Sequence, residues 1–354
     1  MRTKNDNLSR RNFLKQVAIG AIGAGIGVRG LGNVKIVSGG NEQLPGFDKS
    51  NVIAVRNIGI MKSGAPDFKN IKKMMDEGMF ALTGKKTTTD AWREFFNPKD
   101  VVGIKVNPIG GKRLSTRPEV VNAIVLGLTA AGVKENNIIV WDRFDEHLVH
   151  AGYRLNKGSS GIRCYGTEHT SGYDKSTYYE SEDDDHTLRQ DGDNRSFYSS
   201  VATKQVNAII NVPVMKDHGI AGVSLCLKNL AFGVINNTAR FHPSPYFCDP
   251  AVAEVCAHPA IRDRVRLHIL DALQACFSGG PTNMKSHTMW NEERLFIGTD
   301  PVAIDRVGLE IIDKRRKENN FMPVFQTAKL IATAWKNGLG VFDKNNIELI
   351  ELDV

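Results

Sequence analysis

Short apolar runs alternate with longer segments that carry apolar residues at helical spacing. The runs rich in β-branched residues predict strands, and the longer periodic segments predict helices. The expected strands lie at residues 52–56, 101–106, 137–141, 206–215, 266–270, 295–298 and 346–352. The expected helices lie at residues 68–83, 90–96, 120–131, 225–235, 251–256 and 301–317. This alternation predicts an α/β fold with a mostly parallel sheet flanked by helices, in Rossmann-like layers.

Two of the expected helices carry recognisable start signals. Thr116 and Glu119 have the spacing of a capping box, and Pro118 suits the first turn of the same helix. The helix at 301–317 is expected to be capped by Thr299 or Asp300.

The amino terminus carries an export signal. Arg10 and Arg11 precede a Phe-Leu step and an apolar stretch over residues 17–28, the pattern of a twin-arginine (Tat) signal peptide. A membrane-spanning helix needs about 20 apolar residues, so this stretch is short for one. We expect residues 1–40 to be signal and linker, residues 41–354 to form a single α/β domain, and the Tat translocase to be a partner during export to the periplasm. No clean A-x-A cleavage site is present, so anchoring by an uncleaved signal stays open as an alternative.

The charge of the chain is unevenly distributed. Residues 1–40 hold seven of the 46 Lys and Arg residues but one of the 39 acidic residues, so the remainder is nearly neutral. A nucleic-acid-binding domain would be basic in its folded part, and we therefore expect no nucleic-acid partner.

The five cysteines include no C-x-x-C pair. Ferredoxin-type clusters need closely spaced cysteines, so no iron–sulfur cluster is expected in this chain. In an oxidising periplasm one or two disulfides could form, with Cys248 and Cys256 the nearest pair. The alternative is that most of these cysteines are small buried apolar residues.

Residues from about 153 to 200 are polar and aromatic and include an acidic run at 180–185. We expect an insertion of hairpins or loops here. The acidic spacing does not match a calcium loop, and a solvated acidic rim is the preferred interpretation.

Polar side chains occur repeatedly where an expected strand ends, and this is the candidate site. In open parallel sheets, ligands bind in the crevice beyond the carboxyl ends of the strands. Parallel neighbours would therefore bring these residues together: Lys105, Asn107, Asp142, Lys216, Asp217, His218, Asp271 and Asp300. Asp300 can equally be a simple helix cap, and Asp142 can equally pair with Arg143 or a loop amide.

Two further segments extend the candidate site. Gly110 and Gly111 lie between a strand and a helix, where backbone amides can approach an anion, although a plain tight turn is the preferred interpretation. Lys228 lies in an apolar run beside Asn229. An unpaired ammonium there would cost several kcal/mol, so Lys228 is expected to meet a carboxylate or an anionic ligand.

Several motifs resemble one known family. They are Val102-x-Ile104-Lys105-x-Asn107, Lys216-x-His218, Leu227-Lys228-Asn229-Leu230, His242, Asp271-Ala272, Gly280-Pro281, and Gly298-Thr299-Asp300-Pro301-Val302-Ala303-x-Asp305. Over roughly residues 101–313 the chain resembles the bacterial domain-of-unknown-function family 362. Some members of that family carry an attached ferredoxin module, which implies a redox partner as one alternative. The resemblance implies a fold and a site more than an activity.

Three functional hypotheses follow for an exported protein. The first is an enzyme of unknown reaction whose crevice binds a metal or an anionic cofactor. Its metal ligands would be His218, His242, Asp142 and Asp271, its catalytic groups His218, Lys216, Lys228 and Asp271, and its cofactor contacts Lys105, Asn107, Gly110, Gly111 and Asn229. The others are a non-catalytic binder of an anionic ligand and a redox accessory protein.

Overall fold

The computed structural model describes residues 49–62 and 64–354. The expected Tat signal, and the expected boundary at residue 40, lie outside these described residues. Within them, no helix combines the length and the apolar character that crossing a membrane requires.

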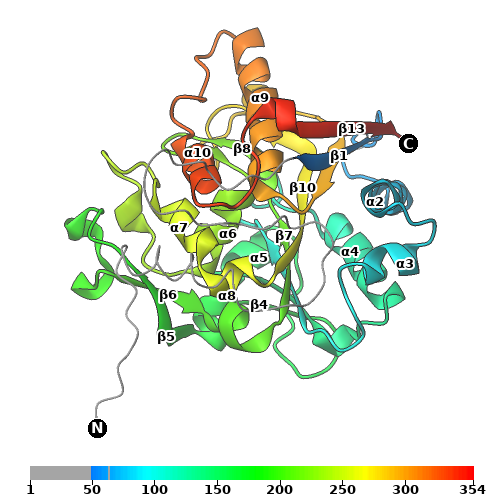
Figure 1. Ribbon diagram of the computed structural model, residues 1–354, viewed down its shortest axis with the longest axis horizontal. Helices are drawn as coiled ribbons and strands as arrows, with labels where there is room; N and C mark the ends of the chain where they lie inside the picture. The colour runs from blue at the N-terminus through cyan, green and yellow to red at the C-terminus, as the bar shows by residue number, and fades with distance from the viewer. Residues whose placement is uncertain (1–48, 63) are drawn as a thin grey trace, which may run out of the picture.

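A large mixed sheet forms the centre of the molecule, with strand order β13-β1-β12-β10-β7-β2-β3-β4 (Figure 1). Its strands are β1 (Ser50–Arg56), β2 (Val102–Val106), β3 (Ile138–Asp142), β4 (Arg163–Gly166), β7 (Ala208–Val212), β8 (Val214–His218), β9 (Gly222–Ser224), β10 (Val265–Cys276), β11 (Met289–Trp290), β12 (Arg294–Gly298) and β13 (Ile347–Asp353). From β10 through β7, β2 and β3 to β4 every pairing is parallel. β12, in contrast, is antiparallel to both of its neighbours, β1 and β10. The predicted α/β fold with a mostly parallel sheet is confirmed.

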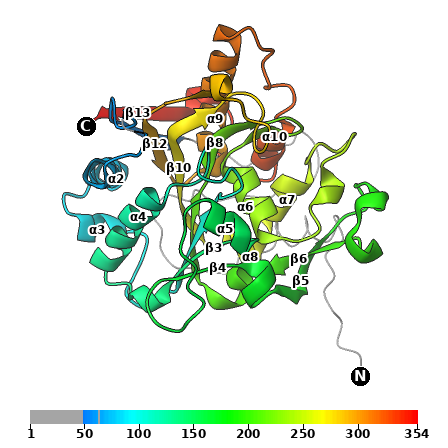
Figure 2. The ribbon, with the colours of Figure 1, turned by 180° about the vertical axis from the view of Figure 1, so that it is seen from behind.

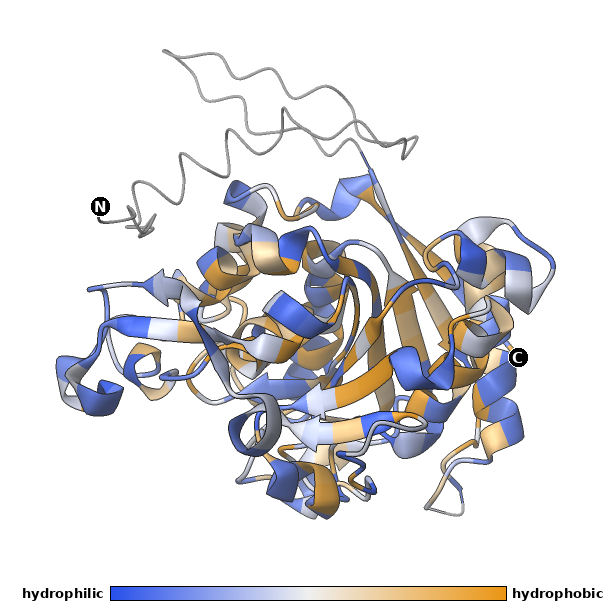
Figure 3. Ribbon diagram, turned by 90° about the horizontal axis from the view of Figure 1, so that it is seen from below, coloured by the Kyte–Doolittle hydropathy of each residue, from blue (hydrophilic) through white to orange (hydrophobic). Residues whose placement is uncertain are grey.

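Helices cover both faces of this sheet. They are α2 (Phe68–Thr83), α3 (Thr88–Arg93), α4 (Pro118–Ala130), α5 (Asp145–His150), α6 (Cys226–Val234), α7 (Ala251–Ala257), α8 (Pro259–Arg262), α9 (Pro301–Glu318) and α10 (Lys329–Lys336). Successive residues of β1 enter different cores: Val52 and Ala54 pack with α6, α7, α9 and α10, whereas Ile53 and Val55 pack with α2, α3 and α4. Figures 1 and 2 show these two helical groups on opposite sides of the strands, and Figure 3 shows the apolar strands between them.

The expected strand at 206–215 is two strands, because Pro213 interrupts it. Proline has no N–H to give to a ladder, and the chain shifts from β7, which pairs with the amino-terminal half of β10, to β8, which pairs further along β10. The carbonyl of Pro213 accepts the backbone N–H of Asp271 at 2.9 Å. This shift carries Lys216 and His218 beyond the end of β7.

The capping box expected at Thr116 is wrong. Helix α4 begins at Pro118, as the proline suggests, but its N-cap is Arg117 and no side chain caps it. The hydroxyl of Thr116 instead accepts the N–H of Asn107 at 2.8 Å and donates to the carbonyl of Val212 at 2.6 Å. Thr116 therefore ties the loop after β2 to the end of β7.

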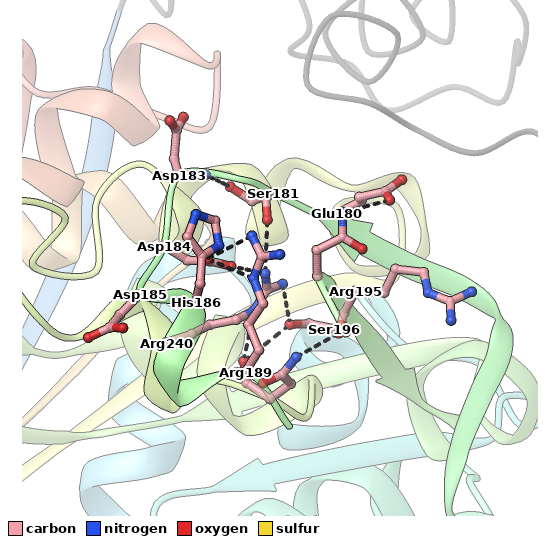
Figure 4. A network of polar contacts seen from close by, with 12 residues as sticks. Glu180, Ser181, Asp183, Asp184, Asp185, His186, Arg189, Arg195, Ser196 and Arg240 are labelled. Carbon is pink, nitrogen blue, oxygen red and sulfur yellow. Dashed lines mark hydrogen bonds and ion pairs between the residues drawn. The ribbon is translucent and has the colours of Figure 1, made fainter. Parts of the chain in front are cut away.

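The insertion at 153–200 is only partly separate from the main sheet. Its first strand, β4, extends that sheet, while β5 (Tyr173–Glu180) and β6 (Arg195–Ser199) form a separate antiparallel pair. The expected solvated acidic rim is wrong for Asp184, which is 3% exposed and forms ion pairs with Arg240 and Arg189 (Figure 4). Arg240 also donates to the Ser181 carbonyl and the Ser196 hydroxyl, both at 2.9 Å. This buried network fastens the insertion to the segment that leads to His242.

Other local expectations were incomplete. The elements α5 and β4 were not predicted because their six and four residues are too few to show a clear period. Helix α10 was also not predicted, although it carries amphipathic spacing with Leu330, Ile331 and Ala334 buried. All five cysteines are free and buried, so no disulfide joins Cys248 and Cys256 in this structure. Asp300 does cap α9, accepting the N–H of Ala303 at 2.8 Å.

Candidate functional site

The carboxyl ends of β2, β3 and β8 meet helix α6 around a cavity of about 200 Å³. Seven of the predicted site residues line this cavity: Lys105, Asn107, Asp142, His218, Lys228, Asn229 and His242. Strand direction explains the convergence, because the parallel strands β2 and β3 deliver their last residues to one edge of the sheet. The geometry of these residues defines what the cavity can bind.

Lys105 and Asp142 form a buried ion pair at the base of the cavity. Lys105 Nζ lies 2.5 Å from Asp142 Oδ1 and donates to the Val106 carbonyl at 2.7 Å. Burial lowers the pKa of Lys105, and the Asp142 carboxylate acts in the opposite direction. A Cβ on Gly233 would lie 2.2 Å from Lys105 Nζ, so only glycine lets α6 pass this close to the pair.

Lys216 lies directly behind the cavity wall. Its side chain is fully buried, and Nζ donates to Asn107 Oδ1 at 2.7 Å. Burial and the neighbouring Lys228 lower the pKa of Lys216 to about 7. The Oδ1 of Asn107 accepts the hydrogen bond from Lys216, so the amide nitrogen is the remaining polar group of the Asn107 side chain. Asn107 itself lines the cavity.

Lys228 projects from α6 and is 8% exposed. Its Nζ lies 3.4 Å from His242 Nε2 and 4.6 Å from the centre of the Phe232 ring. Burial lowers the pKa of Lys228. Among the described residues no carboxylate lies within ion-pair distance of this amine, in contrast to Lys105.

Hydrogen bonds fix the tautomers of both cavity histidines. His218 Nδ1 accepts the N–H groups of Ala221 at 3.1 Å and Ile220 at 3.3 Å, so the neutral ring carries its proton on Nε2. His242 Nδ1 donates to the Thr238 carbonyl at 3.0 Å, which leaves the Nε2 lone pair facing Lys228.

Both rings are neutral at physiological pH. Burial lowers the pKa of His218 to about 2 and that of His242 to about 4, and the nearby Lys228 amine acts in the same direction with a smaller effect. His218 is therefore a neutral hydrogen-bond donor, and His242 is an acceptor.

Helix α6 is held in place from outside by Asp305. Leu225, the N-cap residue of α6, offers no side-chain cap, and Asp305 of α9 accepts the N–H groups of Cys226 at 2.6 Å and Leu227 at 3.0 Å. Burial raises the pKa of Asp305 to about 7. This role of Asp305 was not predicted, because a cap that joins two separate helices leaves no signal in the local sequence.

Five predicted site residues lie away from the cavity. Asp217 accepts the backbone N–H groups of Gly280 at 2.8 Å and Gly279 at 3.1 Å. Asp271 accepts the N–H groups of Arg117 at 3.0 Å and Leu273 at 3.1 Å, and burial raises its pKa. Asp300 leaves the sheet at the opposite edge because β12 is antiparallel to β10. Gly110 and Gly111 form a tight turn, in which a Cβ on Gly110 would meet the Leu114 carbonyl at 2.1 Å. None of these residues lines the cavity.

The proposed metal ligands are not assembled. No group of three or more His, Cys, Asp or Glu side chains in the described part of the chain is arranged to hold a metal ion. Asp271 is remote, His218 directs an N–H into the cavity, and Asp142 is occupied by Lys105. The donor set fits an anion better than a cation.

Several cavity residues were not predicted as site residues. Arg143, Phe232, Thr238 and Ser224 line the cavity. Arg143 is fixed by Glu168 at 3.2 Å and by the Thr238 hydroxyl at 3.0 Å. The sequence signal for Arg143 was its position directly after Asp142, but Arg143 was expected only as a possible ion-pair partner of that carboxylate.

The fold and the site together define an α/β protein with a lysine- and histidine-lined cavity at the carboxyl edge of its sheet. The chain belongs to the family described as "Domain of unknown function (DUF362)", whose model matches residues 102–310. No curated protein matches the chain.

Two solved structures resemble it at low identity. A protein from Thermotoga maritima is 10% identical, with a TM-score of 0.41, over 72% of this chain and 59% of that one. The lactate racemase apoprotein from Thermoanaerobacterium thermosaccharolyticum is 12% identical, with a TM-score of 0.39, over 74% of this chain and 57% of that one. The chain thus spans less than two thirds of either protein.

Proposed function

We propose that this chain is an exported enzyme whose cavity binds a small anionic molecule. The observation that carries this proposal is the environment of Lys228. Its amine lines a buried cavity and has no carboxylate partner among the described residues. An anionic ligand would supply the missing countercharge.

The energetic argument is one of uncompensated charge. Removing an ammonium from water costs several kcal/mol unless an opposite charge or strong acceptors replace the water. Asp142 compensates Lys105. Within the described part of the chain, Lys216 meets only an amide oxygen, and Lys228 only an imidazole nitrogen and an aromatic ring. With both histidines neutral, the cavity has a net positive charge whenever either of these lysines is protonated.

The hydrogen-bonding groups of the cavity also suit an anion. Lys228, the amide nitrogen of Asn107 and the Nε2–H of His218 are donors, and charge-assisted donors of this kind bind carboxylates and phosphates strongly. A metal ion would add positive charge to a cationic site, so we derive no step through a metal. The amine of Lys228, which lines the cavity beside the imidazole rings of His218 and His242, is a group that can act in catalysis, which supports an enzyme over a passive binder.

Export is the second part of the proposal and rests on Arg10, Arg11 and the apolar stretch that follows. It places the folded domain in the periplasm. The Tat route carries folded proteins, so the cavity would be assembled before export.

Isothermal titration calorimetry with phosphate, sulfate, oxalate and pyruvate tests the binding. We expect at least one of them to bind the wild-type chain, and Lys228→Met to weaken that binding about 10- to 100-fold, the value of one charge-assisted hydrogen bond. Lys73→Met, which removes an exposed lysine of α2, is the matched control and should bind like wild type. The proposal fails if none of the four anions binds, or if Lys228→Met binds as tightly as wild type.

A further inference from the structure

We propose that Lys228 is an amine nucleophile that forms an imine with the carbonyl carbon of a small 2-oxo acid held in the cavity. This inference rests on the proposed function, because the carboxylate of the oxo acid would be the anion that the cavity binds. It goes further by naming the substrate class and the atom that reacts.

Lys228 is the lysine of the site that a ligand can reach. Lys105 lines the cavity, but its amine is held by Asp142 and by the Val106 carbonyl. Lys216 is fully buried behind Asn107. To the residues that the structure describes, Lys228 Nζ makes a single, long hydrogen bond, at 3.4 Å to His242, and a nucleophile must be free in this way to change partners.

Lys228 must lose the proton of its ammonium form before its amine can attack a carbonyl carbon. Burial disfavours its charged form and lowers its pKa. Lys228 lies close enough to Lys216 to disfavour the charged form of Lys216, and desolvation of a lysine such as Lys228 activates its amine for Schiff-base chemistry. His242 Nε2, with its lone pair facing Nζ, accepts a hydrogen bond from the amine.

Two donors are placed for the rest of a 2-oxo acid. The Nε2–H of His218 can donate to the carbonyl oxygen and polarise it, because Nδ1 is fixed as an acceptor. The amide nitrogen of Asn107, oriented by Lys216, can donate to the carboxylate. The cavity volume of about 200 Å³ suits a small ligand.

The step balances without an oxidant or a reductant. The Nζ lone pair attacks the carbonyl carbon, a C–N bond forms, and a proton passes from nitrogen to the former carbonyl oxygen. The second proton of the nitrogen then passes to this hydroxyl group as the C–O bond breaks, so the oxygen leaves as water and the nitrogen–carbon bond becomes a double bond.

Reductive trapping tests this proposal. The full-length protein is incubated with pyruvate and sodium cyanoborohydride, and the adduct is located by intact-mass measurement and peptide mapping. We expect one adduct per chain, on Lys228, and its loss in Lys228→Arg. Lys73→Arg should retain it. Oxalate, which has two carboxylates but no ketone or aldehyde carbonyl, should protect Lys228 in the wild-type protein, and this arm decides the matter if Lys228→Arg does not fold.

The outcomes separate the two proposals. Adducts spread over exposed lysines, or an adduct that persists in Lys228→Arg, would overturn the imine. Absence of any adduct while calorimetry shows oxalate or pyruvate binding would overturn the imine and leave anion binding intact. Absence of both adduct and anion binding would overturn both.

Discussion

At the scale of single residues, the three cavity lysines differ because their partners differ. Lys105 has a carboxylate, Lys216 an amide oxygen, and Lys228 an imidazole nitrogen. Only the first of these partners, the carboxylate of Asp142, carries the opposite charge that offsets the burial of a lysine. The other two arrangements are costly in the absence of a ligand, and this cost leads to two predictions.

Lys228→Met should stabilise the ligand-free protein while weakening anion binding. Methionine fills a similar volume without burying a charge, and replacing buried ionic groups by apolar ones gains about 1–4 kcal/mol in known cases. Urea unfolding would measure the gain in the free energy of unfolding, and Lys73→Met should leave that free energy nearly unchanged. A clear destabilisation by Lys228→Met would show that the lysine is structural.

Anion binding should weaken as the pH rises through the pKa of Lys216, which is about 7. The groups that act on this lysine are Lys228 and Lys105, which disfavour its charge, and Asp142 and Cys276, which favour it. An anion favours the protonated lysine, so affinity should be high below this pKa and fall above it. Calorimetry from about pH 6 to about pH 9 checks this, and Lys216→Met should flatten the profile. An equally steep fall in Lys216→Met would assign the titration to another group.

At the scale of elements, α6 forms one wall of the cavity, and its position depends on other parts of the chain. Asp305 caps its amino terminus, and Asn229 donates to Asn211 of β7 at 2.8 Å. Gly233 admits the Lys105–Asp142 pair beneath it. These contacts come from α9, β7 and β2, which are far apart in sequence.

Asp305→Asn should lower the free energy of unfolding by about 1–3 kcal/mol, because one of the two accepting oxygens becomes an NH2 group and leaves the buried N–H of Cys226 or Leu227 without an acceptor. It should also weaken anion binding, because α6 carries Lys228. Asp67→Asn is a matched control, since Asp67 caps α2 through the N–H of Lys69 and is exposed. That variant can lose stability but should keep its affinity. Equal anion affinities of Asp305→Asn and wild type would show that the cap on α6 does not determine anion binding.

The strands and helices with a strong pattern were predictable from the sequence, and so was the convergence of Lys105, Asp142 and His218. Each follows an apolar strand whose direction the α/β alternation implies. Asp300 was misplaced because nothing in residues 294–300 shows that β12 runs antiparallel. The separate roles of Thr116 and Asp305 depend on contacts between distant segments. Such contacts leave no mark on local spacing.

At the scale of the whole molecule, the buried Arg240–Asp184 network joins the β5–β6 insertion to the segment before His242 (Figure 4). Contacts between segments that are distant in sequence thus connect the insertion with the part of the chain that leads to His242.

Replacing Arg10 and Arg11 together by lysine should block export, because the translocase recognises the arginine pair. The full-length variant should accumulate in the cytoplasm, as measured by cell fractionation and immunoblotting. Arg29→Lys, which changes an arginine outside the pair, is the control and should be exported. Periplasmic accumulation of the double variant would contradict Tat export.

The most direct measurement for the central claim is a crystal structure determined with selenate, whose selenium is located by anomalous scattering. The account predicts an anomalous peak inside the cavity, with selenate oxygens in hydrogen-bond contact with Lys228 Nζ and His218 Nε2, and no such peak in Lys228→Met crystals grown in the same solution. Selenate bound only at the protein surface, with an unoccupied cavity in the wild-type crystals, would contradict it.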